Sequence, residues 1–419
     1  MSRGFLEEFL LVLVFILCAV IVVRSFLKRN ELVQFPFLTA AAFLAYVFPQ
    51  LVAVVRNDDL PEAAVEKTLL MSVLCLSAAF VGYLSNRKAA RIGNNWDYNY
   101  RRLIVGIVAL TLLGALSFYK VGDLAIDEDL GSQWSGPITI YFFFGQLLTV
   151  GLVLALVVHM KRPSWVTLAV VVGGMAFYLH RGVILGRRGE MAEFVLMVGV
   201  GLYLRYRWVP PRAMVIAMLA AGTLWINAIG DYRSEVVGGG DVLSAVSSID
   251  FVGNLRSAFD DAPDVINAVY AIDAADRDLS FNYGLRLYND VIMRYVPGQI
   301  IGRDLKESLK SGIGELEYAP GYHFRTGTTN TGMGWAFQTL WYLGAVWFYA
   351  IGVIMNRWFR AATQGSLVGS VVVILVYYQS LVAFSFSPAQ IFLRLIFLMF
   401  SLAPVLCFAR LRPRVLNSV

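Results

Sequence analysis

Four groups of residues in this chain combine arginine with carboxylate, histidine or aromatic side chains. They are Arg181, Arg187, Arg188 and Glu190; Asp231 and Arg233; Arg294 within the segment 288–297; and Tyr322, His323 and Arg325 within the segment 321–330. Arginine suits a diphosphate ligand, because its planar guanidinium pairs with two phosphate oxygens and stays protonated. The four groups therefore predict binding sites for a phosphorylated ligand.

Arg394 is a fifth, isolated candidate for the same role. It lies about six residues into the last apolar stretch of the chain, roughly 9 Å along a helix. An ionisable residue at membrane depth costs free energy and by default indicates function. The alternative is a structural pair with a helix carbonyl or with a carboxylate.

His323 is the candidate for acid–base chemistry. Histidine titrates near neutrality and can take a proton from a sugar hydroxyl. Glu190 and Asp231 are the next candidates for a base, whereas a surface histidine bonded to a neighbouring carbonyl is the alternative for His323. The aromatic Tyr322 and Phe324 beside it suit a carbohydrate, although they would also suit a loop on a membrane surface.

Metal and nucleotide chemistry have weaker support. The acidic runs 127–129 and 276–278 have the short spacing of sugar-nucleotide metal sites, but such spacing recurs by chance in acidic loops. No phosphate-binding loop or dinucleotide fingerprint occurs in the sequence, so soluble nucleotides are not expected as cofactors. We therefore expect no metal and no cofactor.

The elements that must position these residues are strongly apolar. Hydrophobic residues make up 58% of the chain, charged residues only 15%, and the mean hydropathy is +0.65. A soluble domain carries roughly a quarter charged residues, so lipid must solvate much of this surface. The net charge of +6 then belongs to membrane-flanking loops rather than to a nucleic-acid interface.

About eleven stretches are long enough to cross the hydrocarbon layer, which needs about 17–25 residues. They are 9–27, 33–55, 67–85, 103–119, 136–159, 164–181, 191–208, 213–229, 334–355, 366–385 and 388–409. We predict an all-α polytopic membrane protein with helices in 1–229, a large loop in 230–333, and further helices with the C-terminus in 334–419. The loop should form short amphipathic helices on the membrane face that cap a cavity.

Basic residues fall in alternate connections between these stretches. By the positive-inside rule, the N-terminus and the large loop lie outside and the C-terminus lies inside the cell. The loop with Arg181, Arg187 and Arg188 opposes this rule, because alternation puts it outside. A miscounted helix or cations that reach up to lipid headgroups would explain the exception. The functional explanation is an anion bound at the outer face.

Two short motifs and the architecture resemble a known family. The motifs are Arg-Arg-Gly-Glu at 187–190 and the segment from Thr328 to Gly344 that enters the next helix. Together with the single large loop they resemble bacterial O-antigen polymerases of the Wzy type and, more distantly, O-antigen ligases. The resemblance covers the architecture of nearly the whole chain, but specific residues only in 181–190 and 320–344. The helix number and the outward N-terminus depart from the commonest pattern, which leaves polymerase and ligase both open.

The resemblance implies a metal-independent, inverting glycosyltransferase of the GT-C type in the bacterial inner membrane. Its substrate would be a glycan linked to undecaprenyl diphosphate, polymerised at the periplasmic face into O-antigen, capsule or exopolysaccharide, with a chain-length-regulating co-polymerase as a possible partner. Arg181, Arg187, Arg188 and Arg233 would hold the diphosphate. His323 lies where the ligases carry a periplasmic histidine.

A transporter or flippase for a lipid-linked or anionic solute is the alternative of a different class. It would explain Arg394 and the polar loops without any chemistry. Transporters usually carry polar or broken helices near the middle of the bilayer. Most charges here cluster at the outer helix ends instead, which favours an enzyme that works at the outer face.

The predicted orientation can be tested by cysteine labelling. In cells with a permeabilised outer membrane, a cysteine at Ser311 is expected to react with a membrane-impermeant thiol reagent, because the large loop should lie outside. A cysteine at Asn94, in a basic connection, is expected not to react. The opposite labelling pattern would reverse the orientation.

Overall fold

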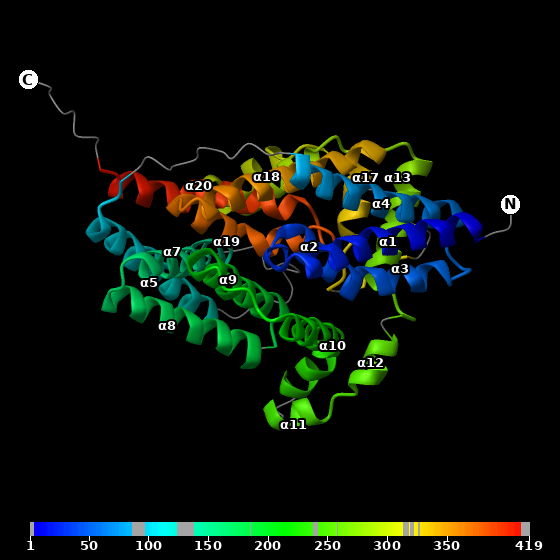
Figure 1. Ribbon diagram of the computed structural model, residues 1–419. Coiled ribbons are helices and arrows are strands. Elements are labelled where there is room, and N and C mark those ends of the chain that lie inside the picture. Colours follow the sequence, from blue (N-terminus) through cyan, green and yellow to red (C-terminus); the bar gives the residue numbers. More distant parts are fainter. Residues whose placement is uncertain are drawn as a thin grey trace, which may run out of the picture.

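The computed structural model describes residues 4–85, 97–123, 138–184, 186–237, 242–257, 259–312, 318, 322–325 and 327–411. All regular structure in these ranges is helical, apart from one isolated bridge between Tyr98 and Arg410. Figure 1 shows the longer helices running side by side in a bundle. Eight helical segments of the described residues are long and apolar enough to cross a membrane, so the chain is a polytopic membrane protein.

These eight segments include continuous helices and helices with breaks. The continuous ones are α1 (Phe5–Leu27), α4 (Glu62–Ser85), α5 (Tyr100–Asp123) and α20 (Ala389–Ala409). The others are α2 (Phe35–Ala42) with η2 (Phe43–Val47) and α3 (Phe48–Val55); α6 (Ile138–Gly145) with α7 (Leu147–Lys161); α8 (Trp165–Leu179) with η4 (His180–Ile184); and α17 (Thr331–Leu340) with η5 (Trp341–Ala345) and α18 (Val346–Thr363).

Three more of the expected stretches are helical but fall outside this set of eight. They are α9 (Arg188–Tyr206), α10 (Arg212–Val237) and α19 (Leu367–Val382). The charges of α9, which include Glu190, Glu193 and Arg205, lower its hydropathy, while α19 and the apolar part of α10 are short. The eleven expected stretches therefore all form helices, whereas length and hydropathy support eight as spans.

Glycines bring α4 and α18 into backbone contact. A Cβ atom added at Gly352 would lie 2.2 Å from the carbonyl oxygen of Ala79 and 2.7 Å from the backbone nitrogen of Tyr83. A Cβ atom added at Gly82 would lie 2.2 Å from the carbonyl oxygen of Tyr349. Helices that pack in lipid use small residues for such close approach, because dispersion between close backbones replaces the hydrophobic drive.

Basic side chains gather at one end of the bundle, which we call the basic end. There Arg29 donates to Val209 O (2.7 Å), Lys161 to Gly365 O (2.8 Å), Arg207 to Thr363 O (2.6 Å), Arg212 to Leu27 O (3.3 Å) and Arg102 to Phe408 O (3.3 Å). Several of these carbonyls lie at or near helix C-termini, where they lack a partner within the helix and carry partial negative charge. The alternate basic connections of the sequence thus meet in space.

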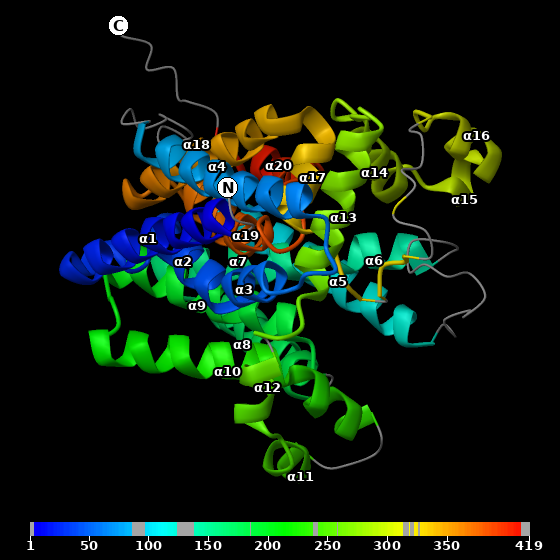
Figure 2. The ribbon, with the colours of Figure 1, turned by 90° about the vertical axis from the view of Figure 1, so that its right-hand side faces the viewer.

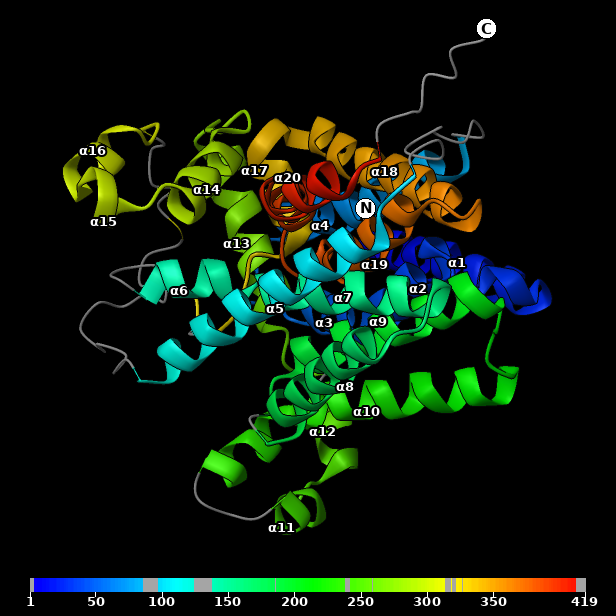
Figure 3. The same cartoon turned by 90° about the vertical axis from the view of Figure 1, so that its left-hand side faces the viewer.

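The region 230–333 forms short helices at the opposite end, the loop end. These are α11 (Val242–Ser247), α12 (Phe251–Ser257), α13 (Pro263–Arg277), α14 (Leu285–Tyr295), α15 (Gly298–Ile301) and α16 (Arg303–Ser308). Figures 2 and 3 show α15 and α16 projecting on one side and α11 on another. By contrast, α13 is built into the bundle against α4 and α17, and nine of its residues are buried.

The close α4–α18 contact predicts a large difference between two glycine substitutions. Gly352→Ala should lower the unfolding midpoint in detergent, because overpacking costs about 1–3 kcal/mol and the neighbouring atoms are backbone. Gly173→Ala in α8 should leave the midpoint unchanged or raise it slightly, since nothing lies within 4 Å of its added Cβ. Equal midpoints for the two variants would contradict the packing.

Candidate functional site

A cavity of about 490 Å³ lies where the bundle meets Asp264 and the segment 327–329. Its walls come from η2, the start of α9, the start of α13, the segment 327–329, and the chain from the end of α19 to the start of α20. Most of the lining is apolar: Ala42, Phe43, Val47, Ala192, Leu196, Leu381, Val382, Phe384 and Phe386. Asp264 is the carboxylate among the described lining residues, and Tyr46, Thr329, Tyr378, Ser385 and Gln390 add neutral polar groups.

One π-helical segment lines this cavity, and a second contacts α9, whose first residues also line it. The first, η2, ends just before Pro49, which has no N–H to donate and whose ring crowds the carbonyl four residues earlier. This segment contributes Phe43, Tyr46 and Val47 to the cavity wall. The second, η4, carries Arg181. Segments of π-helix are rare and often occur at functional sites, because they redirect side chains within a helix.

Asp264 is held from three directions in the first turn of α13. Its Oδ2 accepts a hydrogen bond from the Tyr46 hydroxyl (2.6 Å), and its Oδ1 accepts one from the Thr329 backbone N–H (2.7 Å). The Gln50 side-chain oxygen accepts from the backbone N–H groups of Asp264 (3.1 Å) and Val265 (3.3 Å). Gln50 therefore caps α13 from another helix, and satisfies donors that a helix start leaves free.

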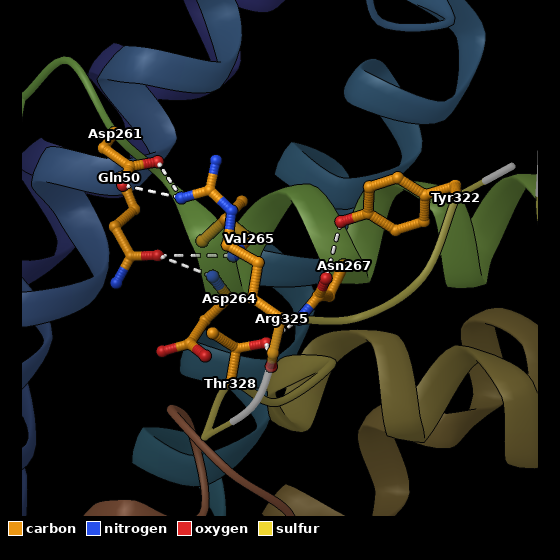
Figure 4. A network of polar contacts seen from close by, with 8 residues as sticks. All are labelled: Gln50, Asp261, Asp264, Val265, Asn267, Tyr322, Arg325 and Thr328. Atoms are coloured by element: carbon orange, nitrogen blue, oxygen red, sulfur yellow. Dashed lines mark hydrogen bonds and ion pairs between the residues drawn. The ribbon is translucent and has the colours of Figure 1, made fainter.

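Asn267, one turn further along α13, holds the segment that precedes α17 (Figure 4). Its amide oxygen accepts from the Tyr322 hydroxyl at 2.6 Å. Its Nδ2 donates to Thr328 Oγ1 at 2.8 Å and to the Thr329 carbonyl at 2.9 Å. Burial and the neighbouring Tyr270 raise the pKa of Tyr322 to about 12, against an opposing effect of Arg325. The Tyr322 hydroxyl thus stays protonated and acts as a donor.

The predicted residues Arg325 and His323 lie on the outer side of this network. Arg325 pairs with Asp261 at 3.0 Å, and both side chains are more than half exposed. His323 is exposed, has no hydrogen bond or ion pair to any described residue, and is not among the cavity-lining residues. Its role as the base stays a prediction. Figure 4 shows the Asp264 carboxylate pointing away from the Arg325 guanidinium.

The structure brings Arg181, Arg187 and Glu190 together, and we call them the arginine cluster. Glu190 accepts from Nη2 of Arg181 (2.6 Å) and also contacts Nε of that residue. Arg187 Nη1 lies 3.5 Å from the same carboxylate and remains 47% exposed. The cluster adjoins the cavity, because Gly189 of the same segment lines it. The side chains of Arg188 and Arg233 lie outside the described part of the structure.

Arg181 is packed as well as paired. Its guanidinium carbon lies 4.9 Å from the ring centroid of Phe118 and 5.4 Å from that of Phe177. Contacts of this kind favour a cation, because the face of an aromatic ring carries negative partial charge. Arg181 is therefore anchored, whereas the more exposed Arg187 can meet a ligand.

The other two predicted sites lie on α14 and α10. Arg294 donates a hydrogen bond to Gln390 Oε1 at 3.2 Å, and Gln390 is one of the residues that line the cavity. Burial lowers the pKa of Arg294, an effect that nearby Asp290 opposes. Asp231 lies within α10 rather than after its end, is exposed, and accepts from Asn254 at 2.6 Å.

Arg394 is buried in the bundle and pairs with Glu193. The two side chains are 7% and 13% exposed, with Nη2 of Arg394 3.0 Å from the carboxylate. Arg394 also donates to Gln146 Oε1 (3.3 Å), at the break between α6 and α7, and to the Leu375 carbonyl (3.4 Å). This is the geometry of a structural pair, and Arg394 does not line the cavity. Glu193 was not among the residues predicted from the sequence, although an acid inside the apolar stretch 191–208 is a signal of the same kind as Arg394.

One of the two acidic runs lies in the described part of the structure, and it does not line the cavity. The run 127–129 lies outside the described residues. In the other run, Asp276 pairs with Lys67 of α4, and Asp278 pairs with Arg277 at 3.1 Å. These two carboxylates therefore form ion pairs at the C-terminal end of α13.

The arrangement combines three chemical features within one region. An apolar cavity suits a hydrocarbon chain, the arginine cluster at its edge suits an anion, and a buried carboxylate in its wall can accept a hydrogen bond from a hydroxyl. Comparison of the chain with protein-family models, with curated proteins and with solved structures finds no match.

The buried Arg394–Glu193 pair makes a prediction about stability. Arg394→Met or Glu193→Leu alone should cost about 3–5 kcal/mol of unfolding free energy, because each leaves a buried charge without its partner. The double variant should recover most of this loss. As a control, Glu307→Gln, which breaks the exposed pair with Lys310, should cost less than about 1 kcal/mol. Additive losses in the double variant would contradict the coupling.

Proposed function

We propose that this chain is a glycosyltransferase of the bacterial inner membrane that polymerises oligosaccharide repeat units linked to undecaprenyl diphosphate. The observation that carries the proposal is the apolar cavity with the arginine cluster at its edge. A lipid-linked sugar diphosphate has an apolar tail, an anionic diphosphate and a hydroxyl-rich glycan. Each of these three parts has a chemical counterpart in and around the cavity.

The diphosphate would lie against the arginine cluster. Arg187 precedes α9, and the N-terminal end of a helix attracts anions through its free N–H groups and its dipole. Glu190 neutralises part of the cluster in the free protein. A bound diphosphate would compete with this carboxylate for the forked donors of Arg181 and Arg187.

The proposal includes a topology. All eleven helices would span the bilayer in a GT-C-like arrangement, with the basic end in the cytoplasm by the positive-inside rule. The N-terminus, the large loop and the cavity mouth would then be periplasmic, and the C-terminus cytoplasmic. The product would be O-antigen, capsule or exopolysaccharide, and a co-polymerase would set its length.

The reaction would be a direct displacement. A hydroxyl at the non-reducing end of one repeat unit attacks the anomeric carbon of a glycan on undecaprenyl diphosphate. The bond from that carbon to the diphosphate oxygen breaks, and the arginines stabilise the charge that develops on the leaving group. Attack opposite the leaving group inverts the anomeric centre.

Transport of a lipid-linked or anionic solute is a second candidate, favoured by a different observation. The buried Arg394–Glu193 pair meets the helix break at Gln146, and buried charges at broken helices are typical of transport pathways. A ligase, the third possibility, would use the same donor but another acceptor. Purified protein reconstituted in liposomes distinguishes polymerase, transporter and ligase.

Purified protein in liposomes with lipid-linked repeat units should form a ladder of polymer with inverted linkages. Arg187→Ala combined with Arg188→Ala should abolish the ladder at normal protein abundance, while lysine at both positions should restore it only in part, because lysine has no planar fork. Arg205→Ala, at the other end of α9, is the matched control and should polymerise like the wild type.

Three results would contradict the proposal. A full ladder from the double alanine variant would exclude the arginine cluster as the diphosphate site. Passage of the lipid-linked unit across the bilayer without any new glycosidic bond would indicate a transporter. Transfer to a lipid acceptor without a ladder would indicate a ligase.

A further inference from the structure

Among the charged groups near the cavity, Asp264 has the position that acid–base chemistry requires. Its carboxylate belongs to the cavity wall, although the residue is only 5% exposed. Glu190 is occupied by two arginines, and Asp231 is exposed on α10. We infer that Asp264 is the catalytic base that receives the proton of the acceptor hydroxyl, an inference that rests on the proposed glycosyl transfer.

The hydrogen bonds of Asp264 leave room for a substrate. A carboxylate offers roughly four lone pairs. The Tyr46 hydroxyl takes one on Oδ2 and the Thr329 N–H takes one on Oδ1, so each oxygen retains a lone pair for a further donor. These two donors, together with the cap that Gln50 forms on α13, fix the orientation of the carboxylate before the substrate arrives. Such preorganisation is what a positioned base needs.

The surroundings of Asp264 also suit a sugar acceptor. Tyr46 and Thr329 contact it directly, Ser385 contacts Thr329, and the described lining residues include no cation. Hydroxyl groups recognise other hydroxyl groups, whereas a diphosphate needs the arginines at the cavity edge. The site is therefore divided into an acceptor part at Asp264 and a donor part at the arginine cluster.

The acceptor oxygen forms a bond to the anomeric carbon while the bond from that carbon to the diphosphate oxygen breaks, and its electron pair leaves with polyprenyl diphosphate. Asp264 takes the proton of the acceptor hydroxyl and afterwards releases it to water. No oxidant, metal or further reactant enters the step.

Asp264→Asn is the variant that removes the base and keeps the contacts. Its amide oxygen can still accept from Thr329 N–H, and its Nδ2 can donate to the Tyr46 hydroxyl oxygen. The single-turnover rate at saturating donor should fall by about 10²–10⁴-fold, the usual range for the loss of an acid–base group. Binding of the lipid-linked donor should remain, because the arginines hold the diphosphate.

Two matched variants accompany it. Asp261 is also an aspartate, lies just before α13, and is not among the cavity-lining residues. Asp261→Asn should therefore keep the wild-type rate. His323→Ala tests the other candidate for the base, whose exposed imidazole is not among the cavity-lining residues. A large loss in His323→Ala together with a wild-type rate in Asp264→Asn would assign the base to His323 and overturn the inference.

A measurement on the wild-type protein covers the case in which Asp264→Asn fails to fold. The apolar reagent dicyclohexylcarbodiimide should modify Asp264 and inactivate the enzyme in parallel, as followed by peptide mass spectrometry. Lipid-linked repeat units should protect both the residue and the activity. Modification of Asp264 with full activity would overturn the assignment.

Different results would overturn the role of Asp264 and the proposed polymerase activity. A wild-type protein that polymerises while Asp264→Asn matches its rate overturns only the role of Asp264. A wild-type protein that forms no product from lipid-linked repeat units overturns both.

Discussion

The carboxylate of Asp264 joins three segments that are distant in the sequence, and the arrangement of the loop end depends on it. Its partner Tyr46 lies 218 residues away, in the second membrane segment, and its partner Thr329 lies 65 residues away, before α17. A charge removed from water must be matched by donors, or the buried position costs several kcal/mol. Satisfying this one group therefore fixes α13 inside the bundle and closes one wall of the cavity.

Several membrane segments depart from regular helix. In lipid, every backbone polar group must find a partner inside the protein, so helices there stay regular unless something compensates. The π segment η2 lines the cavity, η4 contacts α9, whose first residues also line it, and Gln146 stands at the break where Arg394 donates a hydrogen bond. The continuous helices α1, α4, α5 and α20 form the rest of the frame. The chain thus places its irregular backbone where side chains must be redirected.

Two sets of ion pairs differ in how deeply they are buried. Arg394 and Glu193 are almost completely enclosed, so exchanging either for a ligand would expose a buried charge. In the arginine cluster, Glu190 shares its carboxylate between Arg181 and the half-exposed Arg187. Water can reach this second set, so the proposed diphosphate would replace Glu190 at a lower cost than a ligand at the buried pair. Both sets pair arginine with glutamate, so the difference between them comes from how deeply each is buried.

The sequence alone determined the helical class, because long apolar stretches in lipid can satisfy their backbone only within a helix. It also located the arginine cluster, whose members Arg187 and Glu190 are three residues apart and meet across one helical turn. The burial of α13 within the bundle could not be predicted from the sequence, since its mixture of acids and apolar residues resembles that of a surface helix. Likewise, no local pattern linked Glu193 to Arg394, 201 residues away, or Asp264 to Tyr46. Only the tertiary structure decided these contacts. The hydropathy of a residue measures its preference for lipid over water, and it does not specify which residue it contacts in the folded protein.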